Sequence, residues 1–281
     1  MSRFEEHAEG CGPFTTRLTW QADDASIAVW ESRPARKRGV LTVRAAGERE
    51  SRSRSADAVA LRRLRRLNTI AAVAFTIGGA LFALGAGISQ FGAGAATSAS
   101  VYFAGGLFFN TGGYASLLQA INTPHRNSKT GFLETGRWRW WTYEPFRIDW
   151  LSTFTLFAGT VVFGVNLLDS FLHGLSVQQA NRLIWAPDMV GCFLFLASGH
   201  LALLEVCHGR PRLRVHSLGW WIVVINQIGS VLFLLSALAA FTRPATGSLV
   251  NVGVANWGTL LGALCFSVGG ILQLFERPGK Q

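Results

Sequence analysis

Six apolar segments, separated by short polar ones, follow one another along the chain after residue 68. Each is close to the ~20 residues of helix that cross ~30 Å of hydrocarbon, and none contains Lys or Arg. They cover residues 69–91, 100–121, 150–171, 186–206, 219–242 and 252–276. Because a helix satisfies its own backbone hydrogen bonds in lipid, this pattern predicts an all-α membrane protein with six transmembrane helices.

A Gly followed four residues later by a Phe recurs at matching positions of these segments. The clearest pairs are Gly159–Phe163, Gly191–Phe195, Gly229–Phe233 and Gly262–Phe266. Residues i and i+4 lie on one helix face, so each Gly opens a notch that a Phe of a neighbouring helix can fill. We therefore predict three parallel helical-hairpin repeats, at 69–121, 150–206 and 219–276, of which the first is the most diverged.

The positive charge is concentrated on one set of connections. The chain carries a formal charge of +10 although only 15% of its residues are charged. Of its 26 Lys and Arg, all but two lie before the first segment, in the two connections 122–149 and 207–218, or after residue 276. Since cytoplasmic loops retain Lys and Arg, both termini are expected in the cytoplasm. The polar start, "MSRFEEHAEG", does not look like a cleaved signal peptide.

Two stretches carry a resemblance to a known family. The sequences "GWWIVVINQIGSVLFLLSALAAF" (219–241) and "NWGTLLGALCFSVGGILQLFE" (256–276), with the two-span units and cytoplasmic termini, resemble the YrhK-like bacterial membrane proteins. The resemblance covers about residues 61–276. It implies a bacterial inner-membrane location and a hairpin architecture, and it implies no reaction. This chain has three hairpins and a long N-terminal region, whereas the family pattern is a single hairpin.

The N-terminal region, residues 1–60, is polar and precedes a membrane domain at 61–281. Within it, "TTRLTWQADDASIAVWESR" (15–33) alternates in polarity around Asp23 and Asp24, which predicts a small cytoplasmic β-hairpin. Residues 44–57, "RAAGERESRSRSAD", have the composition of a linker. The basic runs "RPARKR" (33–38) and "RRLRR" (62–66) are interpreted as topology signals, with contact to anionic lipids as the alternative.

The segment "RWRWWTYEPFRIDW", residues 137–150, combines aromatic and basic side chains before the third apolar segment. Trp and Tyr settle at headgroup depth and Arg reaches lipid phosphates. Interfacial anchoring or packing on the N-terminal hairpin is therefore favoured, and a lipid-headgroup or small-anion pocket is the alternative; nucleic acid is not expected so close to a membrane span. The candidate contacts are Arg137, Trp138, Arg139, Trp140, Trp141 and Arg147.

Several polar side chains fall inside the apolar segments. The candidate intramembrane polar site consists of Asn110, Asn166, His200, Asn226 and Asn256. His200 is the only His well inside a segment; a hydrogen bond across the bundle is favoured for it over a functional role. Asp169, His173 and Asp188 could share a cation, but solvation and helix capping are the simpler interpretation.

Two acidic residues, Glu205 and Glu276, occupy equivalent repeat positions at helix C-terminal ends, where the helix dipole disfavours a carboxylate. We expect ion pairs with the Arg residues nearest in sequence, which are Arg210, Arg212, Arg214 and Arg277. Gly258 and Gly262 form a further small-residue pair that suits contact within the monomer or between subunits of a homo-oligomer.

Motifs that would define an enzyme are absent from the sequence. It contains no P-loop, HExxH or GxSxG pattern, and its four Cys show no metal-binding spacing. No cofactor is therefore expected. The leading hypothesis is a non-enzymatic structural or interaction protein of the bacterial inner membrane, with the bilayer as its partner. The alternatives are a transporter or channel for a small solute or ion, and an enzyme linked to lipids or quinones.

Overall fold

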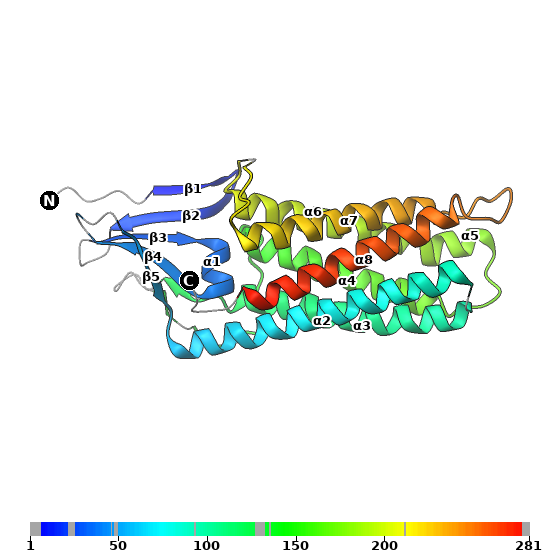
Figure 1. Cartoon of the computed structure of the whole chain (residues 1–281), viewed down its shortest axis with the longest axis horizontal. Helices are drawn as coiled ribbons and strands as arrows, with labels where there is room; N and C mark the ends of the chain where they lie inside the picture. The colour runs from blue at the N-terminus through cyan, green and yellow to red at the C-terminus, as the bar shows by residue number, and fades with distance from the viewer. Residues whose placement is uncertain are drawn as a thin grey trace.

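The computed structural model describes residues 7–21, 26–45, 47, 50–92, 94–126, 133–134, 136–210 and 212–276. It combines a small N-terminal sheet with a long helical bundle, and the sheet stands at one end of the bundle (Figure 1). This arrangement places the first strands and the short helix α1 directly against the ends of the long helices.

The sheet is an antiparallel meander of five strands in the order β1-β2-β3-β4-β5. The strands are β1 (His7–Cys11), β2 (Phe14–Gln21), β3 (Ile27–Glu31), β4 (Val40–Arg44) and β5 (Arg52–Ser55). The predicted hairpin corresponds to β2 and β3, which pair from Arg17↔Glu31 to Gln21↔Ile27; its turn lies outside the described residues. The linker prediction for 44–57 is wrong at β5, because Thr42 of β4 pairs with Ser53 there.

Helix α1 (Ser32–Arg38) interrupts the sheet between β3 and β4. Gly39 ends it with a left-handed φ of 65°, which lets the chain reverse into β4, and the Gly39 N–H donates to Ala35 O at 3.0 Å. Ala35 packs with Trp20 and Leu41 in a small core under the sheet. The opposite side of α1 is thereby turned toward the bundle.

The long helices are α2 (Ala58–Phe91), α3 (Ala95–Ile121), α4 (Ile148–Asp169), α6 (Ala186–Cys207), α7 (Leu218–Ala239) and α8 (Val252–Phe275). A short α5 (Val177–Ala180) and the π-helical turn η1 (Asn181–Trp185) lead into α6, and a two-stranded ladder, β6 (His125–Arg126) with β7 (Leu133–Glu134), precedes α4. The neighbours in contact are α2–α3, α3–α4, α4–α6, α6–α7, α7–α8 and α8–α2, so the helices close into a ring. The predicted boundary between residues 60 and 61 falls inside α2.

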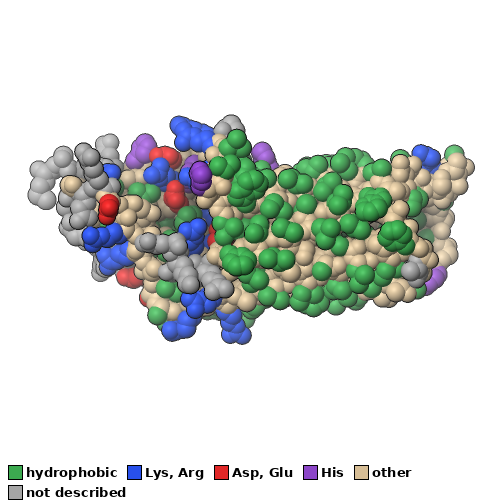
Figure 2. Space-filling model, in the orientation of Figure 1, with side chains coloured by type: hydrophobic (Ala, Val, Ile, Leu, Met, Phe, Trp, Pro, Cys, Tyr) green, Lys and Arg blue, Asp and Glu red, His purple; other side chains and the backbone are tan. Residues whose placement is uncertain are grey.

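Five helical segments in the described part of the chain are long and apolar enough to cross a membrane. They are α2, α4, the α5–η1–α6 segment, α7 and α8. The 27-residue α3 is not among them, because its Asn, Gln, Tyr and small polar residues lower its mean hydropathy. Hydrophobic side chains cover the visible face of the bundle, whereas Lys and Arg gather mainly at the sheet end (Figure 2). The fold is therefore that of a multi-pass membrane protein.

The Gly residues of each helix pair lie against Phe residues of the partner helix. A Cβ added to Gly159 of α4 would meet the Phe195 ring of α6 at 2.8 Å, and one added to Gly191 of α6 would meet the Phe163 ring of α4 at 2.3 Å. The same reciprocal contact joins Gly229 with Phe266 and Gly262 with Phe233. Gly258 also faces α7, at Ser236, so the small-residue pair of α8 serves contact within the monomer.

Candidate functional site

Six Phe rings, one from each long helix, meet on the axis of the bundle. This Phe plug consists of Phe82, Phe109, Phe163, Phe195, Phe233 and Phe266, all of which are buried. Phe163 stacks on Phe195 with centroids 5.0 Å apart, and Phe233 stacks on Phe266 at 5.3 Å. Contacts such as Phe109–Phe195 at 6.4 Å and Phe82–Phe233 at 6.4 Å join the helix pairs. The plug fills the middle of the ring.

A cavity of about 470 Å³, the vestibule, extends from the plug toward the bundle end far from the sheet. Phe82, Phe163 and Phe233 form its floor. Its polar wall is made of Ser89, Ser98, Tyr102, Asn166, Ser170, Asp188, Ser236, Thr242, Asn256 and Thr259. Asp188 is the only Asp, Glu, Lys, Arg or His among the described lining residues, and Asn166 Nδ2 donates to its Oδ1 at 3.5 Å. The vestibule therefore offers one carboxyl group and many neutral hydrogen-bonding groups.

A second cavity, the inner cavity, of about 90 Å³, lies on the other side of the plug. Phe195 and Phe266 contribute to its wall, and Arg33, Arg36 and Lys37 of α1 close its sheet end. Hydroxyl and amide groups complete it, namely those of Ser116, Ser152, Thr153, Ser198, Asn226, Ser230 and Gln273. Vestibule, plug, inner cavity and α1 thus follow one another along the bundle.

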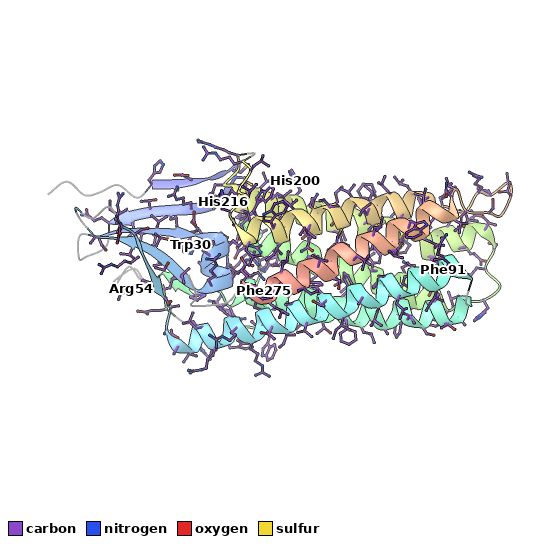
Figure 3. The ribbon with its side chains drawn as sticks, viewed as in Figure 1. Trp30, Arg54, Phe91, His200, His216 and Phe275 are labelled. Carbon is purple, nitrogen blue, oxygen red and sulfur yellow. The ribbon has the colours of Figure 1, made fainter. Side chains whose placement is uncertain are left out.

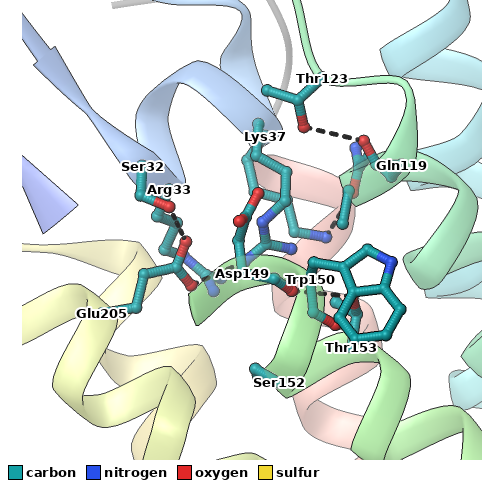
Figure 4. A network of polar contacts seen from close by, with 12 residues as sticks. Ser32, Arg33, Lys37, Gln119, Thr123, Asp149, Trp150, Ser152, Thr153 and Glu205 are labelled. Atoms are coloured by element: carbon teal, nitrogen blue, oxygen red, sulfur yellow. Dashed lines mark hydrogen bonds and ion pairs between the residues drawn. The ribbon is translucent and has the colours of Figure 1, made fainter. Parts of the chain in front are cut away.

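The cations of α1 form buried ion pairs with the helix ends (Figure 4). Arg36 Nη2 donates to Glu205 Oε2 at 2.8 Å, and Ser32 Oγ donates to Glu205 Oε1 at 2.6 Å. Arg33 donates two hydrogen bonds to Glu276, from Nε to Oε1 at 3.1 Å and from Nη2 to Oε2 at 2.8 Å. Burial raises the pKa of Glu276, but Arg33 and Lys37 outweigh it and lower that pKa. The Glu276 carboxylate is therefore held ionised.

The third cation, Lys37, has only neutral partners among the described residues. Its Nζ donates to Gln119 Oε1 at 2.8 Å and to Asn68 Oδ1 at 3.3 Å. Burial, then Arg36 and Arg33, lower the pKa of Lys37 well below its usual value. Gln119 ends α3 at the position that Glu205 and Glu276 hold in α6 and α8. One face of α1 therefore contacts the second helix of each of the three helix pairs.

These contacts correct the prediction for the two glutamates. The expected partners, Arg210, Arg212, Arg214 and Arg277, were chosen because they are close in sequence. The structure instead pairs Glu205 and Glu276 with residues of "RPARKR", more than 150 positions away. Arg214 donates to the Val206 carbonyl at 2.9 Å, and Arg277 lies outside the described residues. The run that was interpreted as a topology signal or lipid contact is mostly buried at the centre of the junction.

The predicted intramembrane polar residues separate into different places. Asn166 and Asn256 line the vestibule, where Asn256 Nδ2 donates to Gln90 Oε1 at 3.0 Å. Asn226 lines the inner cavity. Asn110 donates to the Gly106 carbonyl of its own helix at 3.0 Å. His200 is exposed on the outer surface of the bundle (Figure 3) and reaches neither cavity.

Asp169, His173 and Asp188, which the sequence analysis considered together, do not share one site. Asp188 lines the vestibule, whereas Asp169 and His173 are not among its lining residues. Within the part of the chain that is described, no group of three His, Cys, Asp or Glu side chains is arranged to hold a metal ion. From the sequence, Asp188 was considered as part of a cation site with Asp169 and His173 and, beside Pro187, as a helix cap. Nothing local in the sequence indicated the cavity.

The segment 137–150 packs against the first turns of α4. Trp150 is buried, and Trp141 and Tyr143 pack on its ring with centroids 6.4 and 5.7 Å away. Arg147 is not a free cation, because it forms ion pairs with Glu144 and Asp149. Burial lowers the pKa of Arg147, but these carboxylates raise it overall.

The remaining candidates of this segment lie at its surface. Arg137 and Arg139 are exposed, Trp140 and Trp141 are 65% and 54% exposed, and Trp138 is half-buried near Arg63, whose guanidinium lies 5.8 Å from a Trp138 ring. They leave an aromatic and basic surface beside the junction of sheet and bundle.

A polar contact also links the sheet to the α6 end and has a testable pH dependence. His208 Nε2 lies 3.1 Å from Glu31 Oε1, and this contact lowers the pKa of Glu31 below its usual 4.5. A lowered carboxyl pKa stabilises the fold above ~4.5 and that stability is lost as the pH falls through the folded-state pKa. We expect Glu31→Gln to cost up to ~1 kcal/mol at neutral pH, with the difference from the wild type vanishing in acid. Thermal unfolding of both proteins across this pH range measures it, and a difference that persists in acid would contradict it.

Comparison with known proteins adds no relative. The chain has no significant match to a family model, to a curated protein or to a solved structure. The site must therefore be interpreted from its own geometry.

Proposed function

We propose that this protein is a transporter or channel for a small polar solute, described here with its pathway closed. The observation that carries the proposal is the succession of two cavities on opposite sides of the Phe plug, each with several polar side chains among apolar ones in its wall. A bundle with only a packing role would not leave a hollow of 470 Å³, because packed protein interiors contain few voids larger than a water molecule. The cavities favour transport over the structural or interaction role that the sequence alone suggested, and the proposal assigns no catalytic reaction.

The lining of the vestibule limits the class of solute. Asp188 supplies a carboxylate, and the described lining residues include no Lys, Arg or His. A neutral or cationic solute of small size suits this wall, because an anion would meet Asp188 without a compensating charge. For a solute to pass, the six Phe rings would have to separate and α1 would have to move away from the end of the bundle. Such a pathway is gated rather than an open pore.

The topology belongs to the same proposal. We assign α3 as a sixth span, because it lies in the ring with the five apolar helices and carries no charged side chain. The three helix pairs are then parallel repeats, related by the Gly and Phe contacts and by the positions of Gln119, Glu205 and Glu276. From the distribution of Lys and Arg we assign the sheet to the cytoplasmic side of a bacterial inner membrane and the vestibule to the end of the bundle on the other side. The likeness to YrhK-like proteins stays a prediction.

The exposed aromatic surface supports this placement. Trp140, Trp141, Tyr143 and Phe146 are each more than half exposed and lie at the sheet end of the bundle. With Arg137 and Arg139 beside them, they suit the headgroup layer of a membrane containing anionic lipids. Arg147 is excluded from this contact by its ion pairs.

Removing one ring from the Phe plug tests the proposed transport pathway. Phe195→Ala removes a ring that contacts Phe109, Phe163, Phe233 and Phe266, and it should raise the permeability of proteoliposomes to methylammonium and urea in stopped-flow light scattering. The substitution costs ~3–5 kcal/mol of stability, so folded protein is selected by gel filtration before reconstitution.

Two variants control this flux experiment. Phe275→Ala removes an exposed ring from the outer surface of α8 and should leave the flux unchanged. Asp188→Asn, combined with Phe195→Ala, should reduce the flux of methylammonium but not that of urea. A folded Phe195→Ala protein with wild-type flux for both solutes would rule out the pathway.

A further inference from the structure

The inner cavity is lined by basic side chains and by no acidic one. Arg33, Arg36 and Lys37 border it, and among the described residues that line it there is no Asp or Glu. Arg33 bonds Glu276 and Arg36 bonds Glu205, both outside the cavity lining. Asp149 is also near, and it shares Arg147 with Glu144. Lys37 is therefore the one of the three basic residues that bonds no carboxylate among the described residues.

Donors around this cavity are also left without acceptors among the described residues. Arg36 Nε is buried and has no hydrogen-bond partner. Lys37 Nζ has three N–H donors, and only two acceptors are found, Asn68 and Gln119. No acceptor is found for the Ser116 hydroxyl or for Asn226 Nδ2, both of which belong to the cavity wall, and Asn226 Oδ1 likewise has no donor. An unpaired buried donor costs free energy, and more so when it is charged.

We propose that the inner cavity binds a small monovalent inorganic anion of halide size beside Lys37 and Arg36. A single anion would be the counter-ion of a protonated Lys37 and would accept hydrogen bonds from donors that otherwise lack partners. The volume of about 90 Å³ accommodates one such ion with a water or two, since a water occupies ~30 Å³ of liquid. A lipid headgroup or a gluconate ion does not fit this volume.

The position of the site means that a bound ion would help to hold α1 against the bundle. The anion would bridge α1 to the bundle at the one hairpin whose terminal residue, Gln119, is neutral, and it would complete the attachment that Glu205 and Glu276 provide to the other two. This site does not rest on the proposed transport function, because an ion that holds α1 against the bundle would do so whether or not a solute passes.

The test compares chloride with gluconate, an anion too large for the cavity. The purified full-length protein in mild detergent is unfolded thermally in sodium gluconate at constant ionic strength, while chloride or bromide replaces the gluconate stepwise. We expect a rise in melting temperature that saturates with halide concentration, because a ligand of the native state stabilises it by mass action. Chloride that adds no stability beyond gluconate would overturn the proposal.

Lys37→Met locates the ion. The variant keeps an unbranched side chain but removes the buried Nζ donor, so it should lose the chloride-dependent rise and be at least as stable as the wild type in gluconate. A merely structural Lys37 would instead make the variant less stable by the same amount in both salts, which would overturn the proposal. Arg65→Met, which removes an exposed cation of α2, is the matched control and should retain the full rise.

A second variant keeps the test decisive if Lys37→Met does not fold. Ser116→Ala combined with Asn226→Leu removes two neutral donors from the wall and leaves every charge in place. It should weaken the dependence on bromide, giving a midpoint at higher bromide concentration. An unchanged midpoint in this variant, or equal halide responses in Lys37→Met and Arg65→Met, would place any bound ion elsewhere and overturn the proposal.

Discussion

Replacing Glu205 with Leu is expected to destabilise the protein by ~3–5 kcal/mol, because it leaves a buried guanidinium without its counter-charge. The Arg36 and Glu205 side chains are 4% and 0% exposed, so solvent cannot take the place of the lost carboxylate. Burial alone lowers the pKa of Arg36, but Glu205 more than offsets it and keeps the pKa raised. The free energy of unfolding in denaturant, measured in mild detergent, gives the size of the loss.

Two further variants separate the buried pair from charge effects in general. Arg36→Met in the Glu205→Leu background removes the second charge and should restore most of the lost stability, since an apolar pair of similar volume replaces a buried ion pair at little cost. Glu9→Gln breaks the exposed Glu9–Arg17 pair at 3.5 Å and should change the stability by ~0–1 kcal/mol. A Glu205→Leu protein as stable as the wild type would show that α1 is not held by this pair.

The apolar segments of the sequence predicted the helices well, because bilayer thickness and backbone hydrogen bonding constrain them strongly. The predicted segment 150–171 corresponds to α4 at Ile148–Asp169, and 219–242 corresponds to α7 at Leu218–Ala239. The sequence could not show that α2 begins as early as Ala58. There the helix includes the basic stretch "RRLRR", which lies before the apolar segment, so the length needed to cross the bilayer does not predict where the helix begins.

The junction was much harder to predict, because its partners are far apart in the chain. Sequence reasoning recognised that Glu205 required a counter-charge, but it could only choose among neighbouring Arg residues. Helix α1 has a Pro and a dense positive charge, which indicate a surface segment rather than a buried helix. Strand β5, "RSRS", has no apolar side at all and forms only because β4 offers a free edge. Tertiary contacts decided both elements.

The two cavities could not have been located from the sequence either. The matched Gly and Phe positions predicted that helices approach closely, and the Phe rings do lie against those notches. They did not show that six rings would meet on one axis, since that depends on how the three helix pairs close into a ring. Asn166 and Asn226 have similar surroundings in sequence, yet they line different cavities.

The closure of that ring depends on the contact between α2 and α8, and Gly79→Val is expected to disrupt it. A Cβ at Gly79 would lie 2.7 Å from Ala263 O and 2.8 Å from Ser267 N, which are backbone atoms that cannot rotate away. The two helices must then separate, at a cost of at least ~1–3 kcal/mol. Gly87→Val in the same helix meets nothing within 4 Å and is the matched control. Thermal unfolding in detergent should show a large drop in melting temperature for Gly79→Val and little change for Gly87→Val. Equal melting temperatures for the two variants would mean that α2 and α8 do not pack this closely, and the ring that encloses both cavities would lose its support.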